Sequence, residues 1–193
     1  KITHRGILNR GTSHTHRAIS TFPSLTVLAD GTLLAAYRVG STKDSADETI
    51  ELRHSLDNGI TWSDPKTPFA TKLDSIQGSL KVGYITSVDD KHLLVVAMWV
   101  NRQTYPDKPL FNDATEGCLP IKIVLADSFD QGQSWSAWRV LSVPDDIGPP
   151  SLTNPVIVLP SGRLVISIET NKNYEDQGTW YQRVVYFYSS DSG

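Results

Sequence analysis

The chain has 193 residues, of which 39% are hydrophobic and 20% are charged, and its formal net charge is −3 at pH 7. This composition excludes a disordered or fibrous chain and is typical of a globular protein whose residues 1–193 form a single domain. The basic residues form no stripe or run, so nucleic acid is not expected as a partner.

The longest apolar run covers residues 93–100 and is far shorter than the roughly 18 residues that a membrane helix needs, so we expect no membrane span. Cys118 is the single cysteine, which excludes a disulfide within the chain and a thiolate metal cluster. We expect neither a metal nor a cofactor. The chain opens on Lys1 without a recognisable signal peptide, which fits a processed precursor or a shortened chain. The compartment stays open, with a secreted or periplasmic location preferred.

No apolar pattern of helical period is sustained over three turns. Short runs rich in Val, Ile, Leu, Thr, Tyr and Trp instead alternate with Gly, Pro, Asp, Asn and Ser. In chain order, a strand, a tight turn and a second strand are predicted over residues 25–37, 85–96 and 155–166. A third strand follows each of them, over residues 49–54, 121–127 and 183–188. The sequence therefore predicts an all-β fold of three β-meander units.

A short pattern, Ser-x-Asp-x-Gly-x-(Thr/Ser)-Trp, comes after each third strand. It fills residues 55–62 and 128–135 and begins again at residue 189, at separations of 73 and then 61 residues. The Asp carboxylate can accept hydrogen bonds from the backbone of its own turn, Gly allows a positive φ, and Trp packs the loop against the sheet. Because a catalytic group is needed once and these groups recur, we interpret them as structural. The residues with this role are Ser55, Asp57, Gly59, Trp62, Ser128, Asp130, Gly132, Trp135, Ser189, Asp191 and Gly193.

These repeats resemble the Asp-boxes, or BNR repeats, of the sialidase (neuraminidase) family of β-propellers. The resemblance implies a propeller in which six four-stranded blades surround a central axis. About three blades fall within this chain, at approximately residues 18–70, 76–142 and 150–193. Three blades do not close a ring, so the remaining blades or a second copy of the chain are expected as partners. Because the sequence stops inside a repeat, we expect the remaining blades rather than a second copy as the partner.

Strand parity predicts which end of the blades carries function. If the first strand of a blade descends, its tight turn and the Asp-box both lie at the bottom, and the loop between the second and third strands lies at the top. The upper loops are residues 39–48, 101–120 and 170–180, which are long and polar, whereas the bottom turns are short and repetitive. Long irregular loops on a regular scaffold are the usual place for ligands.

The sialidase family holds the carboxylate of its substrate with three arginines, the first of them in a Tyr/Phe-Arg-Ile-Pro motif that enters the first blade. The matching stretch here is Ser-Thr-Phe-Pro, so Thr21 stands at the position of the arginine. A threonine cannot provide the two parallel hydrogen bonds of a guanidinium. The usual recognition of sialic acid therefore requires that Arg17 or Arg38 take over.

The family also implies an acidic residue in the first upper loop as general acid/base, and a Tyr-Glu nucleophile pair from later blades. Asp44 and Asp47 lie 11 and 8 residues before Ser55, and apolar walls or a second acid are expected to raise the pKa of the catalytic carboxyl. Glu169 follows the apolar residues 164–168 and is expected to face the axis, where it can pair with either aspartate in glycoside hydrolysis. The alternatives are solvated loop acids and, for Glu169, an ion pair on the rim.

Several other upper-loop residues suit a sugar, because aromatic rings stack on sugar rings and cations meet carboxylates. The substrate-binding candidates are Arg17, Arg38, His16, Trp99, Arg102, Tyr105, Lys172 and Tyr174. Their alternative role is packing within the loops. His14 and His16 point to one side of an extended segment, as a metal pair or partners of substrate hydroxyls would, but no third ligand is evident.

These features together predict a carbohydrate-active propeller, a sialidase-like exo-glycoside hydrolase with altered specificity that takes a glycan as substrate. A non-catalytic propeller that binds a glycan or a protein through the same loops is the first alternative. A polysaccharide lyase that uses His14, His16 and Tyr105 is the second. A hydrolase needs two convergent carboxyl groups, whereas a binding module needs only aromatic and hydrogen-bonding groups.

Overall fold

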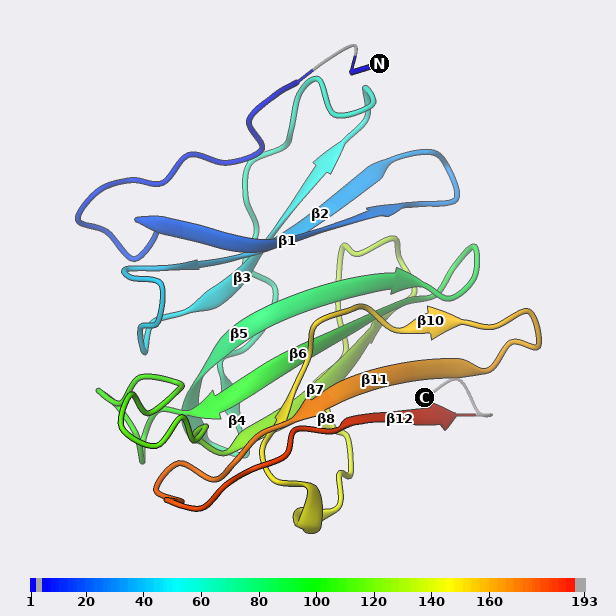
Figure 1. Cartoon of the computed structure of the whole chain (residues 1–193). Helices are drawn as coiled ribbons and strands as arrows, with labels where there is room; N and C mark the ends of the chain where they lie inside the picture. Colours follow the sequence, from blue (N-terminus) through cyan, green and yellow to red (C-terminus); the bar gives the residue numbers. More distant parts are fainter. Residues whose placement is uncertain (3–4, 190–193) are drawn as a thin grey trace.

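The computed structural model describes residues 1–2 and 5–189, which form β-strands and one short 3₁₀ helix, η1 (Asp145–Ile147). Figure 1 shows antiparallel sheets stacked on one another. The first sheet contains β1 (Ile19–Val27), β2 (Leu33–Gly40) and β3 (Thr49–Ser55). The second contains β4 (Lys72–Leu73), β5 (Ile76–Ser87), β6 (Leu93–Asn101), β7 (Ile121–Ser128) and β8 (Arg139–Val140). The third contains β9 (Pro150–Ser151), β10 (Ile157–Val158), β11 (Leu164–Thr170) and β12 (Val184–Ser189).

The predicted all-β class is confirmed, and each predicted meander is present. The strands of the first sheet pair in the order β1-β2-β3, and those of the third in the order β10-β11-β12. The sequence placed the first strands too late, because β1 starts at Ile19 and β5 at Ile76. No helix in the described part of the chain is long and apolar enough to cross a membrane.

Strand β6 lies in the middle of the stack and buries both of its faces. Alternate side chains beginning at Leu94 belong to the apolar cluster that includes Ile166 of β11. The intervening side chains, beginning at Leu93, belong to the cluster that includes Leu34 of β2. Residues 93–100 are all apolar because neither face of this strand meets water. The two apolar clusters hold the three sheets face to face.

The chain is irregular at a similar position in each meander, in the segment that leads to its first hairpin. The pairing of β1 with β2 shifts register between Thr21 and Ser24, and that of β5 with β6 shifts between Leu80 and Gly83. In the third sheet, residues 152–156 interrupt the edge between β9 and β10, which both pair with β11. A bulge bends a strand and re-aims its side chains. These irregularities decide which side chains reach the candidate site described below.

The sheets end in two kinds of connection. The three long loops, residues 39–48, 101–120 and 170–180, gather at the left of Figure 1, and the hairpins β1-β2, β5-β6 and β10-β11 lie at the right. We call these the loop end and the turn end. The strand parity in the sequence predicted this separation, and it follows from the antiparallel pairing of every meander.

The first repeated turn, residues 55–62, is closed by its own side chains. The Oγ of Ser55 donates to Asp57 over 2.8 Å and accepts from the Gly59 amide over 2.8 Å. The carboxylate of Asp57 also accepts the amide and the hydroxyl of Thr61, over 2.8 and 2.6 Å. Gly59 has a φ of 84°, a conformation that favours glycine.

The second turn, residues 128–135, repeats this network bond for bond. Asp130 accepts from Ser128 over 2.9 Å and from the amide of Ser134 over 2.9 Å. The Gly132 amide donates to Ser128 over 2.9 Å. The indole of Trp135 donates to the Gly132 carbonyl over 3.2 Å. The third copy begins at Ser189, and its Asp191 and Gly193 lie outside the described residues.

After each turn the chain returns to the sheet. The backbone of Lys66 forms two hydrogen bonds with Leu52 of β3, of 2.8 and 2.9 Å. In the second sheet, β8 pairs with β7 at the equivalent place, Val140 opposite Val124. Neighbouring turns also touch, because Lys66 donates to the side chain of Gln133 over 3.2 Å. A short strand, β8, therefore follows the repeated turn in the second sheet, and an isolated bridge follows it in the first.

The hydrogen bonds in the two turns lower the pKa of Asp57 and Asp130 to about 2, chiefly through the hydroxyls of Thr61 and Ser134. A carboxyl with a lowered folded-state pKa stabilises the fold above its unfolded pKa of about 4, and this stabilisation is lost as the pH falls toward 2. We expect the double variant Asp57→Asn and Asp130→Asn to be less stable at pH 7. Its free energy of unfolding should also fall less steeply than that of the wild type between about pH 4 and 2.

Denaturant titrations at a series of pH values test this expectation. Asp90→Asn is the control, because the Asp90 side chain lies on a hairpin at the same end and makes no hydrogen bond to a described residue. An unchanged pH slope in the double variant would contradict a structural role for the two turn aspartates.

Candidate functional site

The three long loops contact one another at the loop end. The amide of Leu110, in the second loop, donates to the carboxylate of Asp44 in the first. Lys108 pairs with Glu175 of the third loop over 2.9 Å. The loop end is therefore one continuous surface built by all three sheets.

A cavity of about 520 Å³ opens at this end, and we call it the loop-end cavity. Its lining includes a residue from each irregular first strand: Phe22 from β1, Lys81 from β5 and Leu152 from the gap between β9 and β10. Phe22 has a φ of 52°, which turns it out of the regular strand. The complete lining is Phe22, Arg38, Lys43, Asp44, Lys81, Val82, Met98, Pro109, Leu110, Phe111, Asp113, Ser151, Leu152, Thr153 and Glu169.

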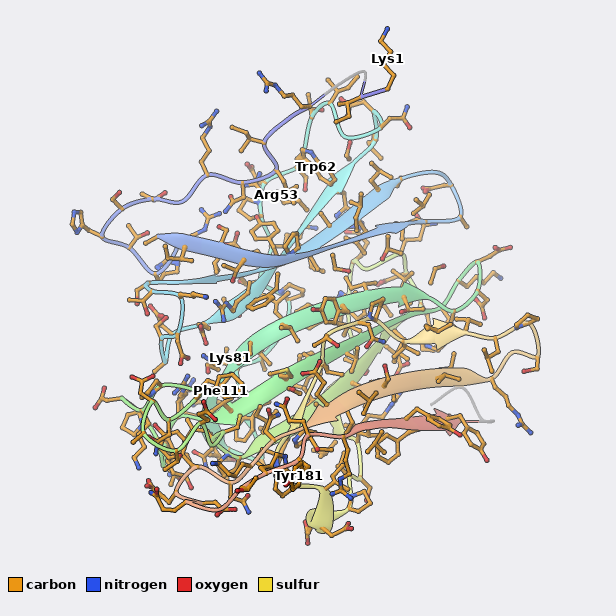
Figure 2. The ribbon with its side chains drawn as sticks, viewed as in Figure 1. Lys1, Arg53, Trp62, Lys81, Phe111 and Tyr181 are labelled. Carbon is orange, nitrogen blue, oxygen red and sulfur yellow. The ribbon has the colours of Figure 1, made fainter. Side chains whose placement is uncertain are left out.

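A buried ionic cluster forms one wall of the loop-end cavity. Lys81 is only 1% exposed, and its ammonium pairs with Asp44 and, over 2.5 Å, with Glu48. Glu48 is fully buried and also pairs with Arg38 over 2.9 Å. Arg102 pairs over 3.2 Å with the same Asp44 oxygen that Lys81 contacts. Three cations thus surround two carboxylates, and Figure 2 shows Lys81 and Phe111 at this end of the molecule.

These contacts set the charge of Asp44. Burial alone would raise the pKa of the Asp44 carboxyl, but the Lys81 ammonium, the Leu110 amide and the Arg102 guanidinium together hold that pKa below its ordinary value. The sequence led us to expect a raised pKa for a catalytic aspartate at this position, but the pKa of Asp44 is lowered. The reason is that the cations come from the second sheet, which no spacing within the first loop reveals. Asp44 is an ionised group at neutral pH.

Glu169, from β11, lines the same cavity. Its carboxylate makes no hydrogen bond or ion pair to any residue that the structure describes. Lys172, its expected rim partner, instead donates to the Gly178 carbonyl over 3.2 Å. The structure therefore brings Asp44 and Glu169 to one cavity, one engaged by cations and the other available.

Asp47 and Arg17 do not line the loop-end cavity. Asp47 accepts hydrogen bonds from the amide and hydroxyl of Ser41, both over 3.1 Å, and these bonds together with one from Ser45 hold its pKa below the ordinary value although burial opposes them. Arg17 forms a two-pronged pair with Glu51, over 2.5 and 2.8 Å. Asp47 thus closes its own loop, and Arg17 fastens the N-terminal segment to the first sheet.

Arg38 is the arginine near Thr21 that does line the cavity. Its guanidinium carbon lies 4.9 Å from the centre of the Phe22 ring, and burial lowers its pKa. The hydroxyl of Thr21 is buried without a hydrogen-bond partner in the described part of the chain. Arg38 therefore occupies the neighbourhood of the missing arginine, but it is committed to Glu48.

Trp99, Arg102 and Tyr105 have packing or positioning roles in this structure. The indole of Trp99 is buried, donates to the Thr71 carbonyl over 2.8 Å and packs on Gly78, where a Cβ would lie 2.1 Å from it. Arg102 is buried and holds the second loop through bonds to Ser79 and two backbone carbonyls. Tyr105 packs against the apolar cluster of the second and third sheets. The expectation of a sugar-stacking Trp99 does not fit its burial.

His14 and His16 are exposed on the N-terminal segment and do not line the cavity. Among residues 1–2 and 5–189, no group of three or more His, Cys, Asp or Glu side chains is arranged to hold a metal ion. Trp62 and Trp135 also lie away from the cavity, at the turn end.

Lys172 and the third loop line a second hollow, which we call the side groove. It has a volume of about 810 Å³ and lies between the second and third loops. Its lining is Phe111, Asn112, Asp113, Glu116, Asn171, Lys172, Gly178, Thr179, Trp180 and Gln182. Tyr174 is not among the lining residues, and its carbonyl accepts hydrogen bonds from Asn112 and Thr115, of 2.9 and 2.6 Å.

Sequence reasoning missed Phe22, Glu48, Lys81 and Phe111. One signal was present: Lys81 lies between two apolar residues, Leu80 and Val82, and a lysine is seldom buried unless it is paired. The register shift hides it, because the bulge breaks the alternation that would place Lys81 on a face of the strand.

No protein-family model matches the chain. Among solved structures, the Hadza microbial sialidase Hz136 is similar with a TM-score of 0.71 and 20% identity, over 92% of this chain and 36% of that one. An α-L-arabinanase from Penicillium chrysogenum, complexed with arabinobiose, has a TM-score of 0.57 and 17% identity, over 90% and 46%. An ulvan lyase, from a new family of polysaccharide lyases, has a TM-score of 0.59 and 12% identity, over 90% and 42%.

These likenesses show the fold. The chain has the all-β architecture of the matching parts of a sialidase, an arabinanase and a polysaccharide lyase. It spans less than half the length of each of these three proteins.

The ionic cluster predicts a large effect at Lys81. Lys81→Met removes the cation that Asp44 and Glu48 share, and a buried carboxylate without its partner costs about 3–5 kcal/mol of unfolding free energy. Denaturant unfolding measures the loss. Lys108→Met is the control, because Lys108 pairs with Glu175 at an exposed position and should have little effect. A loss at Lys81 as small as that at Lys108 would contradict the buried cluster.

Proposed function

We propose that this chain is part of a carbohydrate-active β-propeller that hydrolyses a glycosidic bond in the loop-end cavity. The observation that carries the proposal is the meeting of two carboxyl groups, Asp44 and Glu169, from different sheets in one cavity with cationic and aromatic walls. Two carboxyl groups beside the scissile bond are the usual equipment of a glycoside hydrolase. The likeness to a sialidase and an arabinanase supports this class of substrate.

The two carboxyl groups differ in environment, and we assign their roles accordingly. Hydrolysis needs one carboxylic acid to protonate the leaving oxygen and one carboxylate to stabilise the positive charge on the sugar ring. Lys81 and Arg102 keep Asp44 ionised, so Asp44 is the carboxylate. Glu169 is left as the proton donor. The glycosidic C–O bond breaks as the proton passes from Glu169 to the leaving oxygen. The oxygen of a water molecule then bonds to the sugar carbon, and the proton that the water loses returns to Glu169.

The sialidase-like assignment belongs to the same proposal. The hydrogen bonds of the repeated turns support it, because Asp57 and Asp130 are acceptors within their own turns. Under this proposal the three sheets are blades of a six-bladed propeller, at approximately residues 18–70, 76–142 and 150–193. The substrate differs from that of ordinary sialidases, because Thr21 replaces one arginine and Arg38 is paired with Glu48.

Two alternatives remain distinct. A lyase that uses His14, His16 and Tyr105 loses support, because none of these residues lines the loop-end cavity. A non-catalytic glycan-binding propeller is favoured by one observation, the engagement of Asp44 by three partners within the protein. The hydrolase and the binding propeller differ in one respect. A hydrolase needs the two carboxyl groups for turnover, whereas a binding propeller needs them only for binding.

Asp44→Asn and Glu169→Gln are each predicted to abolish hydrolysis without unfolding the protein. The reason is that each variant keeps the shape of the side chain and removes its acid–base function. A panel of aryl glycosides that includes sialosides, uronides and arabinosides, tested on the longest natural form of the chain, provides the measurement. Asp47→Asn is the control and should retain activity. Glycan binding without turnover in the wild type would instead favour the binding module.

We also propose that further blades of the propeller cover the two outer sheets. On β12, Val184, Tyr186 and Tyr188 point away from the core, and Tyr186 is 68% exposed. On β1, Leu25 and Val27 are likewise exposed. This chain covers 36% and 46% of two similar solved structures, which is consistent with additional blades on these faces.

If the third sheet is covered in the natural protein, Tyr186→Asp should lower its Tm by about 5 °C or more, because a charge would be buried there. Leu56→Asp is the matched control, since Leu56 is 87% exposed on the first repeated turn. Differential scanning calorimetry on the longest natural form distinguishes the cases. Equal Tm values for both variants would show that the outer face of β12 is open to water.

A further inference from the structure

Phe22 has a backbone conformation that an aromatic residue rarely adopts. Its φ of 52° lies in the left-handed region, which is strained for a bulky residue with a Cβ. The register of β1 shifts between Thr21 and Ser24, so two residues of β1 lie opposite a single residue of β2. A glycine would fit such a bulge without strain. The presence of a phenylalanine at this position therefore needs a reason other than the backbone.

The packing of the sheets does not supply that reason. Phe22 belongs to neither of the two apolar clusters that hold the sheets together. Its side chain lines the loop-end cavity and is 42% exposed, and the Arg38 guanidinium carbon lies 4.9 Å from the centre of its ring. Strained residues of this kind gather at ligand sites, where the surrounding structure holds them in place. The position of Phe22 thus indicates a ring that is presented to a ligand.

The Arg38 guanidinium on which this ring stacks is itself fixed. Arg38 is 4% exposed, pairs with Glu48 over 2.9 Å and donates to the Lys43 carbonyl over 2.5 Å. Both partners belong to the first long loop, residues 39–48. Because the ring rests on a buried and paired cation, it is positioned before a ligand arrives, and little ordering is needed on binding.

The unpaired charges of the loop-end cavity disfavour an acidic sugar. Arg38 and Lys81 are both paired with carboxylates of the protein. The Lys43 ammonium and the carboxyl groups of Asp113 and Glu169 line the cavity without an ion pair or hydrogen bond to any residue that the structure describes. A carboxylate on the substrate would therefore meet one unpaired cation and two unpaired acidic groups. An uncharged sugar ring avoids this repulsion.

An aromatic ring recognises the part of a sugar that carries no charge. The C–H groups of a sugar ring form an apolar face, and aromatic side chains bury such surfaces in small-molecule sites that also hold a few polar groups. Thr21, next to Phe22, stands at the position where the resemblance to sialidases implies an arginine, and a threonine provides no guanidinium for a carboxylate. The adjacent residues Thr21 and Phe22 thus favour the same kind of substrate.

We infer that Phe22 is a specificity-determining residue of the loop-end cavity, whose ring stacks on an uncharged sugar and selects neutral glycosides over sialosides and uronides. This inference rests on the proposed function, because it takes the loop-end cavity as the place of hydrolysis. It adds the class of substrate, a neutral glycoside, and the residue that recognises it. The positive φ of Phe22 is retained because it turns the ring toward the substrate.

Three substitutions at Phe22 separate the ring from the backbone. Phe22→Ala removes the ring and keeps the strain, Phe22→Gly removes both, and Phe22→Tyr keeps both. Phe129→Ala is the matched control, because Phe129 is a 71% exposed phenylalanine on the second repeated turn and does not line the cavity. The measurements are steady-state kinetics on neutral aryl arabinosides, galactosides and glucosides and on acidic aryl sialosides and glucuronides, with the longest natural form of the chain. Thermal unfolding gives the Tm of each variant.

The wild type should hydrolyse its best neutral glycoside with a kcat/KM at least about tenfold above that for either acidic one. Phe22→Ala and Phe22→Gly should both raise the KM for this glycoside about tenfold and change kcat by less than about threefold, because the ring binds the sugar and takes no part in bond breaking. Phe22→Tyr and Phe129→Ala should keep the KM of the wild type. The Tm of Phe22→Gly should exceed that of Phe22→Ala by about 2 °C or more, since only glycine relieves the positive φ.

The outcomes separate this inference from the proposed function. An unchanged KM in Phe22→Ala and Phe22→Gly, or acidic glycosides hydrolysed as well as neutral ones, would overturn the role of Phe22. A Phe22→Gly variant no more stable than Phe22→Ala would contradict the strained conformation on which that role depends. In these cases hydrolysis still stands if Asp44→Asn and Glu169→Gln are inactive on the same substrates. A wild type that hydrolyses none of the glycosides would overturn the proposed function and this inference with it.

Discussion

The burial of both faces of β6 is the constraint on which the rest of the structure depends. One row of its side chains packs toward the first sheet and the other toward the third, so the three sheets must stack face to face. Stacked meanders bring their long loops to one end and their tight turns to the other. At the irregular positions of the three sheets, Phe22, Lys81 and Leu152 leave the regular strand pattern and line one cavity. The candidate site is thus a consequence of sheet packing and of three local irregularities.

Lys81 connects the packing of the sheets with the ionised state of Asp44. It belongs to the second sheet, but its two partners, Asp44 and Glu48, belong to the first long loop. A buried cation between two carboxylates fixes the loop relative to the sheet and at the same time keeps Asp44 ionised. The same interaction therefore has a structural and a functional effect. An isolated first sheet would lack both effects, because its long loop would have no lysine ammonium with which Asp44 and Glu48 could pair.

Much of the fold could be predicted from the sequence, and less of the site. The alternation of strands and turns and the repeated Asp–Gly turns identified the meanders, and strand parity placed the long loops opposite the turns, because these features are local and periodic. Local spacing also selected Asp44, Glu169 and Arg38, which do reach one cavity. It misjudged the pKa of Asp44 and the exposure of Trp99, because both depend on contacts between sheets. The bulges that aim Phe22 and Lys81 leave no periodic signal.

The most direct test of the account is a crystal structure of the Glu169→Gln variant, in the longest natural form of the chain, with the oligosaccharide that binds it best. The account predicts a sugar ring in the loop-end cavity, with its glycosidic oxygen beside residue 169 and its ring carbon beside Asp44. A sugar bound at the turn end, near Trp62 or Trp135, or a loop-end cavity in which Asp44 lies away from the ligand, would contradict it.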